Sequence, residues 1–271
     1  MDVKKSLELL DSLYTQGNLE QAESCLDQWI TESLETRNYP AALTFFNEME
    51  GLLRTTGRAE DAADISDQAL ELISMMGLNG TVHHATTLQN GATANRVAGN
   101  LDKALDMYIR AVEIYRYTGN SKTYQMASIY HNMSHIYQEK GQHSTALIFL
   151  DNALDIISAF DDSDAEIATT YVCMALSHMA VNDMEKAEEK LNKAMQYYDT
   201  DDGKQDGHYG SALSAWGEFY WHKKDYEKAI ETFETALQFT YNRFGKNQGC
   251  DVIRHNIELI KNEMNNTKED N

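Results

Sequence analysis

Apolar residues recur at helical spacing along this chain, and short polar breaks separate the helical stretches. Residues 126–140 carry large side chains three or four positions apart: Tyr130, Met133 and Tyr137. Gly141 follows, and glycine commonly ends a helix. A second stretch has the same spacing on one face: Ala146, Leu150, Ala153, Ile156 and Ile157. The pattern predicts two helices joined by a tight turn.

This turn and the start of its second helix occur six times. The copies occupy 17–22, 57–62, 99–104, 141–146, 182–187 and 224–229. Their closing alanines lie 40, 42, 42, 41 and 42 residues apart. A fixed period in this range is typical of stacked supersecondary units, so the sequence predicts a solenoid.

The repeat also predicts how the chain is divided. We expect one solenoid over 1–264, with units near 3–40, 41–80, 81–120, 123–161, 164–200 and 207–245. Apolar residues over 247–264 predict a helix that caps the last unit, and 265–271 is expected to be a flexible tail. Two helices per unit and the cap give thirteen helices. No strand is expected, because no apolar pattern alternates strictly.

Each second helix carries a small–large–small stripe. Four strict copies are Ala104–Tyr108–Ala111, Ala146–Leu150–Ala153, Ala187–Leu191–Ala194 and Ala229–Phe233–Ala236. Small side chains let two helices cross closely while large neighbours fill the gaps. The first two units have looser versions, as terminal repeats often do.

These stripes resemble the tetratricopeptide repeat, over roughly residues 3–245. The resemblance implies an all-α, right-handed superhelical solenoid that binds proteins or peptides. Its period is longer than the usual 34 residues and is similar to that of kinesin light chains and bacterial peptide-pheromone receptors. HEAT or armadillo repeats share the period, but the alanine pattern argues against them.

Composition narrows the choice of partner. The formal net charge is −20, from 43 acidic and 23 basic residues, so the surface repels nucleic acid and anionic lipid. The three cysteines are far apart and form no Cys-x-x-Cys pair, which favours reduced thiols and a cytoplasmic location. The sequence shows no secretory signal and no membrane-length apolar run.

The resemblance also implies where a ligand binds. The first helices of such repeats line a concave groove, where kinesin light chains carry asparagines. The matching positions in this sequence predict these groove residues: Asn90, Thr93, Arg96, His131, Asn132, His135, Gln138, Glu218 and Trp221. Carboxamides suit the backbone of an extended peptide. The alternative is that Asn90 and Asn132 only bridge neighbouring helices.

Other patterns give no catalytic, metal or cofactor site. The pairs His83–His84 and His131–His135 lack the glutamate of a His-Glu-x-x-His motif and a clear third ligand. The acidic run 199–203 fails the calcium-loop spacing. Phosphate-binding, dinucleotide-binding and nucleophile-elbow motifs are absent, and Cys173 has no catalytic sequence context.

We therefore expect a non-catalytic module that binds a protein or peptide partner in its groove, without nucleic acid, membrane or cofactor. Two alternatives stay open. One is a cytoplasmic receptor for a short signalling peptide, and the other is the regulatory subunit of an enzyme.

Overall fold

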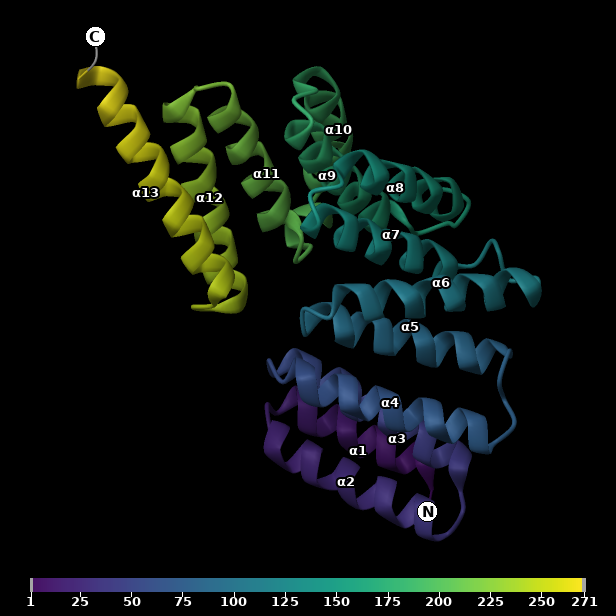
Figure 1. The fold of residues 1–271 in the computed structure, drawn as a ribbon. Helices are drawn as coiled ribbons and strands as arrows, with labels where there is room; N and C mark the ends of the chain where they lie inside the picture. The colour runs from purple at the N-terminus through teal and green to yellow at the C-terminus, as the bar shows by residue number, and fades with distance from the viewer. Residues whose placement is uncertain (1, 270–271) are drawn as a thin grey trace. The chain divides into compact units, whose positions relative to one another are not determined.

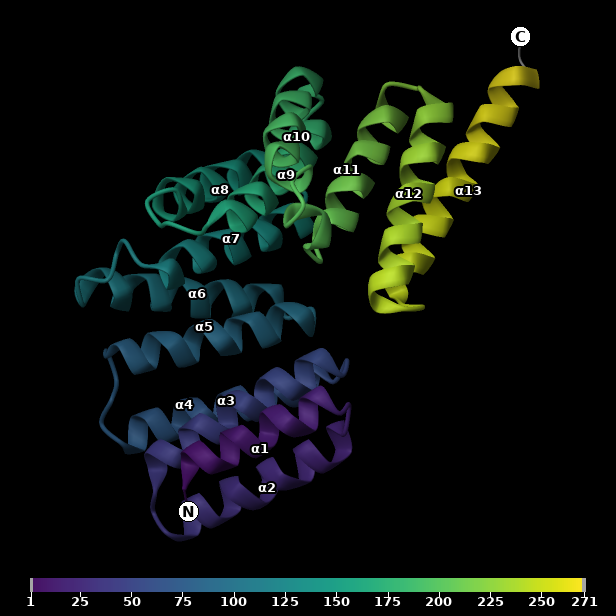
Figure 2. The same ribbon diagram turned by 180° about the vertical axis from the view of Figure 1, so that it is seen from behind.

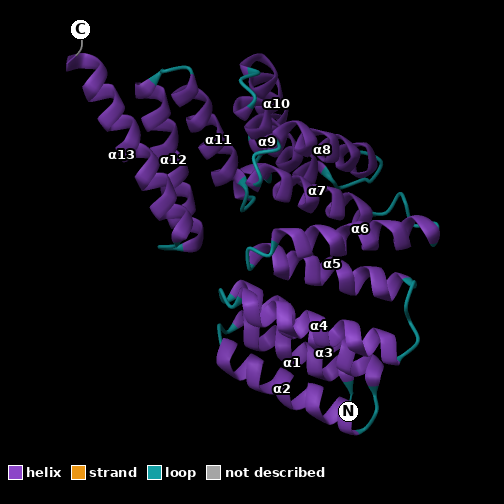
Figure 3. Ribbon diagram, in the orientation of Figure 1, coloured by secondary structure: helices purple, strands orange, loops and turns teal. Residues whose placement is uncertain are grey.

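The computed structural model describes residues 2–269 (side chains through residue 266), and these residues form thirteen α-helices, one short 3₁₀ helix and no strand (Figures 1 and 3). The α-helices are α1 (Val3–Thr15), α2 (Leu19–Glu35), α3 (Tyr39–Thr55), α4 (Ala59–Met75), α5 (Val82–Val97), α6 (Leu101–Tyr117), α7 (Tyr124–Glu139), α8 (His143–Ile157), α9 (Asp164–Ala180), α10 (Met184–Tyr198), α11 (Tyr209–His222), α12 (Tyr226–Phe244) and α13 (Gln248–Glu269). The expected all-α solenoid of thirteen helices is confirmed.

In every repeat, the residue that begins the turn between the two helices has the same left-handed backbone conformation. Gly141 ends α7 with φ 70°, and Gly17, Gly57 and Gly99 have the same left-handed conformation. In the fifth and sixth repeats, Asn182 (φ 60°) and Lys224 (φ 59°) occupy this turn position. Glycine adopts this conformation without strain, which explains why the turn was readable from sequence.

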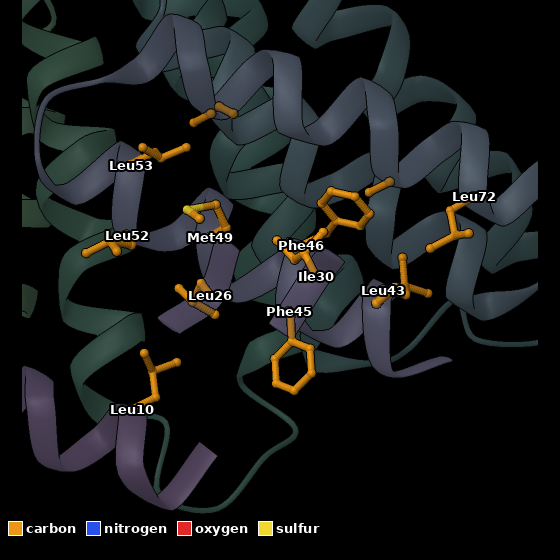
Figure 4. Packing of buried hydrophobic residues seen from close by; sticks show 14 of the residues in the cluster. Leu10, Leu26, Ile30, Leu43, Phe45, Phe46, Met49, Leu52, Leu53 and Leu72 are labelled. Carbon is orange, nitrogen blue, oxygen red and sulfur yellow. The ribbon is translucent and has the colours of Figure 1, made fainter. Parts of the chain in front are cut away.

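Contacts divide the chain into two compact units, 1–136 and 137–271, with the boundary inside α7. One core cluster of the first unit is formed by α1 to α4 together with Ala94 of α5, and Figure 4 shows part of it. Leu26 and Phe45 are fully buried there, and Trp29 packs its ring 5.3 Å from Phe45. The expected stripe residues Ala104, Tyr108 and Ala111 of α6 are also completely buried.

The second unit has its own clusters. Ala187, Leu191 and Ala194 of α10 are fully buried against α9 and α11. Ile253, Ile257 and Ile260 of α13 cover the apolar side of α12. The expected capping helix therefore exists, and it runs to Glu269, beyond the expected end at 264. Of the expected tail, 265–269 are helical and 270–271 lie outside the described residues.

In each unit, one pair of neighbouring first helices packs directly together. The contacts join α3 to α5 in the first unit and α9 to α11 in the second (Figures 1 and 2). Second helices contact the first helices beside them instead. We call the surface formed by the first helices of a unit its inner face. None of the helices in residues 2–269 combines the length and apolar character needed to cross a membrane.

Candidate functional site

The inner face of the first unit brings the predicted residues of α5 next to α3. Asn90, Thr93 and Arg96 lie three residues apart on α5 and are half-buried. Asn90 donates its Nδ2 hydrogen to Oδ1 of Asn47 on α3 at 3.2 Å. The asparagine therefore bridges two first helices, which is the alternative role that its sequence position left open.

Thr93 is tied to the second helix of its own pair. Its hydroxyl donates to the carbonyl oxygen of Gln89 at 3.0 Å and shares a 2.8 Å hydrogen bond with the hydroxyl of Tyr108. Tyr108 is the fully buried central residue of the α6 stripe. Because the Thr93 hydrogen is used on Gln89, Tyr108 donates in the shared bond. Burial raises the pKa of Tyr108 to about 12, so the phenol stays neutral.

The sequence reasoning missed the matching residues of α3. Arg54 stands three residues before Gly57, just as Arg96 stands three residues before Gly99. The charges of both arginines and of Glu50 act on the hydroxyl of Tyr108. Aligning the repeats on their turn residues, rather than on the asparagines alone, would have identified Arg54 as the counterpart of Arg96.

Glu50 is the most unusual residue of this face. It lies seven residues before the left-handed turn residue, where four other first helices carry a small residue (Ala92, Ser134, Ala175 and Gly217) and α1 carries Leu10. Only 3% of Glu50 is exposed. Burial raises its pKa to about 8, opposed by the charge of Arg54 one turn later. The carboxyl is therefore mostly protonated at neutral pH.

A hollow of about 390 Å³ opens beside Arg54 on the same face. It is lined by Tyr14, Leu19, Glu48, Gly51, Leu52, Arg54 and Thr55. Burial and the nearby Asp11 raise the pKa of Glu48. Burial, Glu48 and Asp11 raise the pKa of Tyr14 to about 12. The hollow thus combines a guanidinium, a neutral phenol and one carboxylate.

Three predicted residues lie on the part of α7 that belongs to the first unit. His131 and His135 share a helical face as expected, with ring centroids 4.9 Å apart in an edge-to-face arrangement. Asn132 is half-buried beside them.

In the second unit, Gln138 joins the end of α7 to α9. Its Nε2 donates to the carbonyl oxygen of Cys173 at 2.9 Å and to the hydroxyl of Ser177 at 2.8 Å. Cys173 is buried, and burial raises the pKa of its thiol to about 12. A protonated, enclosed thiol is a weak nucleophile.

Glu218 and Trp221 lie one turn apart on α11. Trp221 donates its indole hydrogen to Glu263 on α13 at 2.7 Å, and the Tyr226 hydroxyl donates to the same carboxylate at 3.0 Å. Glu218 is half-exposed, with His222 at 3.9 Å, and burial of the carboxyl raises its pKa. Trp221 therefore helps to hold the capping helix.

Two other histidines, His84 and His208, have local structural roles. His84 accepts the backbone hydrogen of Gly80 on Nδ1 at 3.1 Å, which fixes the turn before α5. In the loop before α11, Asp206 accepts from the backbone and ring nitrogens of His208 at 2.7 and 2.9 Å.

Comparison with known proteins agrees with this architecture. The model of the tetratricopeptide repeat family matches residues 83–159, 125–200 and 166–239, which together span more than half of the chain. No curated protein sequence matches the chain.

Several solved structures share the fold. BtubC (BKLC) from P. vanneervenii is 17% identical with a TM-score of 0.68, covering 84% of this chain and 93% of that one. NprR in complex with its cognate peptide NprX is 15% identical (TM-score 0.65; 95% and 78% covered). The apo form of RapI is 16% identical (TM-score 0.66; 97% and 72% covered). With these helix pairs, alanine stripes and family matches, the chain belongs to the tetratricopeptide repeat family.

Proposed function

We propose that this protein is a non-catalytic interaction module that binds an extended peptide, or a segment of a protein partner, on its inner face. The paired carboxamides of Asn47 and Asn90 carry the proposal. They use one donor and one acceptor on each other. A carboxamide offers two donors and an acceptor oxygen. Each side chain therefore keeps capacity for a peptide backbone, and both are half-exposed.

The general chemistry of the chain supports this function. A net charge of −20 disfavours nucleic acid and anionic membranes as partners. The free cysteines Cys25, Cys173 and Cys250 fit the reducing cytoplasm. The thiol of Cys173 is enclosed and protonated, which argues against nucleophilic catalysis at that residue.

A receptor for a short signalling peptide is the second candidate. It is favoured by the fold shared with NprR, whose structure holds its cognate peptide, over 95% of this chain. The two candidates differ in what a bound peptide does. A receptor changes conformation on binding, which small-angle X-ray scattering with and without peptide would detect, whereas a scaffold keeps one scattering profile.

Peptide selection tests the proposal. Purified full-length protein is used to select from a displayed library of random peptides, and affinities are measured by calorimetry. Replacing both Asn47 and Asn90 with Ala should weaken the affinity for the selected peptide about fivefold to more than a hundredfold. This range follows from roughly 0.5–1.5 kcal/mol of binding free energy for each hydrogen-bonding group. Asn152→Ala on the second helix α8 is the matched control and should leave affinity unchanged. A library that yields no binder, or equal losses in both variants, contradicts the proposal.

A further inference from the structure

The loop between α4 and α5 contains an asparagine followed by a glycine, Asn79 and Gly80. Both residues are exposed in a turn, so solvent water reaches them. Gly80 has a left-handed backbone (φ 78°), and a Cβ built on it would meet no atom within 4 Å. Because glycine has no side chain, nothing hinders its backbone nitrogen as a nucleophile. The pair is therefore suited to ring closure between the nitrogen of Gly80 and Cγ of Asn79.

The side-chain carbonyl of Asn79 is held by a hydroxyl group. Oγ of Ser74, in the last turn of α4, donates its hydrogen to Oδ1 of Asn79 at 3.2 Å. Nucleophilic attack on Cγ places negative charge on this oxygen. A hydrogen-bond donor that is already in place stabilises such a charge as it develops. Ser74 is therefore placed to polarise the carbonyl group of Asn79.

The backbone N–H of Gly80 is held by an imidazole. Nδ1 of His84, in the first turn of α5, accepts this hydrogen at 3.1 Å. An unprotonated nitrogen at such a distance is within the reach that a general base needs. Burial and the charge of Arg110 lower the pKa of His84, which keeps the ring neutral at neutral pH. The backbone nucleophile and a base are thus in contact before any reaction.

Helix capping accounts for only part of this arrangement. Thr81 is the N-cap of α5, and its hydroxyl accepts from the backbone nitrogen of His84 at 3.4 Å. The hydrogen bond from Ser74 starts on α4, outside that cap, and ends on the side chain of Asn79. Two separate contacts therefore converge on the two groups that must react.

We propose that Asn79 is a self-catalysed deamidation site, at which the nitrogen of Gly80 attacks Cγ of Asn79 and His84 is the general base. The new bond joins the Gly80 nitrogen to Cγ, and the Gly80 proton passes to Nδ1 of His84. The hydroxyl of Ser74 stabilises the charged oxygen. The imidazolium then returns the proton to the side-chain amide nitrogen, the Cγ–Nδ2 bond breaks, and ammonia leaves.

Solvent water completes the reaction. It adds to either carbonyl of the cyclic imide and breaks the bond between that carbonyl and the ring nitrogen. Opening at Cγ leaves aspartate, whereas opening at the main-chain carbonyl leaves isoaspartate, whose backbone runs through the former side chain. The sum is hydrolysis of an amide to a carboxylate and ammonia, with no oxidation or reduction. The product adds a negative charge to the loop between the second and third repeats.

The test incubates the purified protein in water enriched in heavy oxygen and follows Asn79 by peptide mass spectrometry. We expect heavy oxygen at this residue in both aspartate and isoaspartate, which electron-transfer fragmentation distinguishes. The reaction should be at least about tenfold faster in the folded protein than in the same chain in urea. The second Asn–Gly pair, Asn90–Gly91, should show the reverse order, because α5 fixes its backbone in the folded protein. Aspartate without isoaspartate, or a folded rate no faster than that in urea, overturns the inference.

Variants assign the rate to the two contacts. His84→Asn keeps a hydrogen-bond acceptor near the position of Nδ1 but loses the base, so it should slow the reaction at least about tenfold. Ser74→Ala should slow it about fivefold or more. His83→Asn, at the exposed neighbouring histidine, is the matched control and should keep the wild-type rate. A wild-type rate in folded His84→Asn or Ser74→Ala overturns the inference. Circular dichroism identifies a variant that does not fold, and the comparison of folded with urea-treated wild type then decides.

Discussion

Ser66 of α4 stands where a side chain at Gly91 of α5 would begin. Oγ of Ser66 lies 1.8 Å from the position of a Cβ at residue 91, and the methyl carbon of Met107 lies 2.5 Å from it. Two helices of different repeats thus meet at a glycine–serine contact. The contact sets how closely α5 approaches α4.

The first prediction compares two helical glycines. Gly91→Ala should destabilise the protein by roughly 1–3 kcal/mol, because the added methyl overlaps Ser66. Gly51→Ala should stabilise it by about 0.5–1 kcal/mol, because alanine is the better helix former and the space is open. Urea unfolding of both variants checks the pair. Equal effects of the same sign would show that the contact with Ser66 does not decide the outcome.

Much of this fold was readable from the sequence because its signals are local. A left-handed turn residue recurs in all six repeats and a strict alanine stripe in four of them, so the six turns and the second helices were placed correctly. Gly51 and Gly91 look alike in the sequence and differ only in what lies opposite them. The hydrogen bond between Trp221 and Glu263 spans 42 residues. Such partners are fixed by tertiary packing, which the repeat pattern does not specify.

The second prediction concerns pH and Glu50. The pKa of this carboxyl rises from 4.5 to about 8 on folding, so the folded protein binds the proton more tightly. Stability is therefore fully present below about pH 4.5, falls as the pH rises toward 8, and then levels off. The loss has an upper limit of about 1.4 kcal/mol per pH unit within this window.

Glu50→Gln removes that dependence, because the amide is neutral at every pH. Thermal melts from pH 5 to 8 should show that the stability of the variant relative to the wild type rises with pH. The total rise in relative unfolding free energy should be roughly 2–4 kcal/mol. Glu60→Gln, at an exposed site, controls for the loss of one negative charge. Parallel melting of Glu50→Gln and the wild type throughout would mean that Glu50 is ionised in the folded protein.

The third prediction concerns the capping helix. Glu263 accepts hydrogen bonds from Trp221 and Tyr226, and these bonds, that of Trp221 first, lower its pKa. Glu263→Ala should destabilise the protein by about 1 kcal/mol and speed amide exchange in α13. The fluorescence of Trp221 should shift as its environment changes. Glu258→Ala on the same helix is the exposed control, and equal exchange in the two variants would remove the anchoring role of Glu263.

The fourth prediction tests the bridge between first helices. Asn47→Ala and Asn90→Ala should each destabilise by roughly 0.5–1.5 kcal/mol, because each removes the same 3.2 Å hydrogen bond. The double variant should therefore lose less stability than the sum of the losses in the two single variants. Denaturant unfolding of the four proteins gives the coupling energy. Strict additivity would show that the two carboxamides do not interact in solution.

Photo-crosslinking tests the central claim, binding on the inner face, most directly. A selected peptide carrying a benzophenone side chain at successive positions is irradiated with the wild-type protein, and the adducts are mapped by mass spectrometry. We predict adducts on the first helices, beginning with α3 and α5 around Asn47, Gly51 and Asn90. Adducts confined to the second helices α2, α4, α6, α8, α10 and α12 would contradict it.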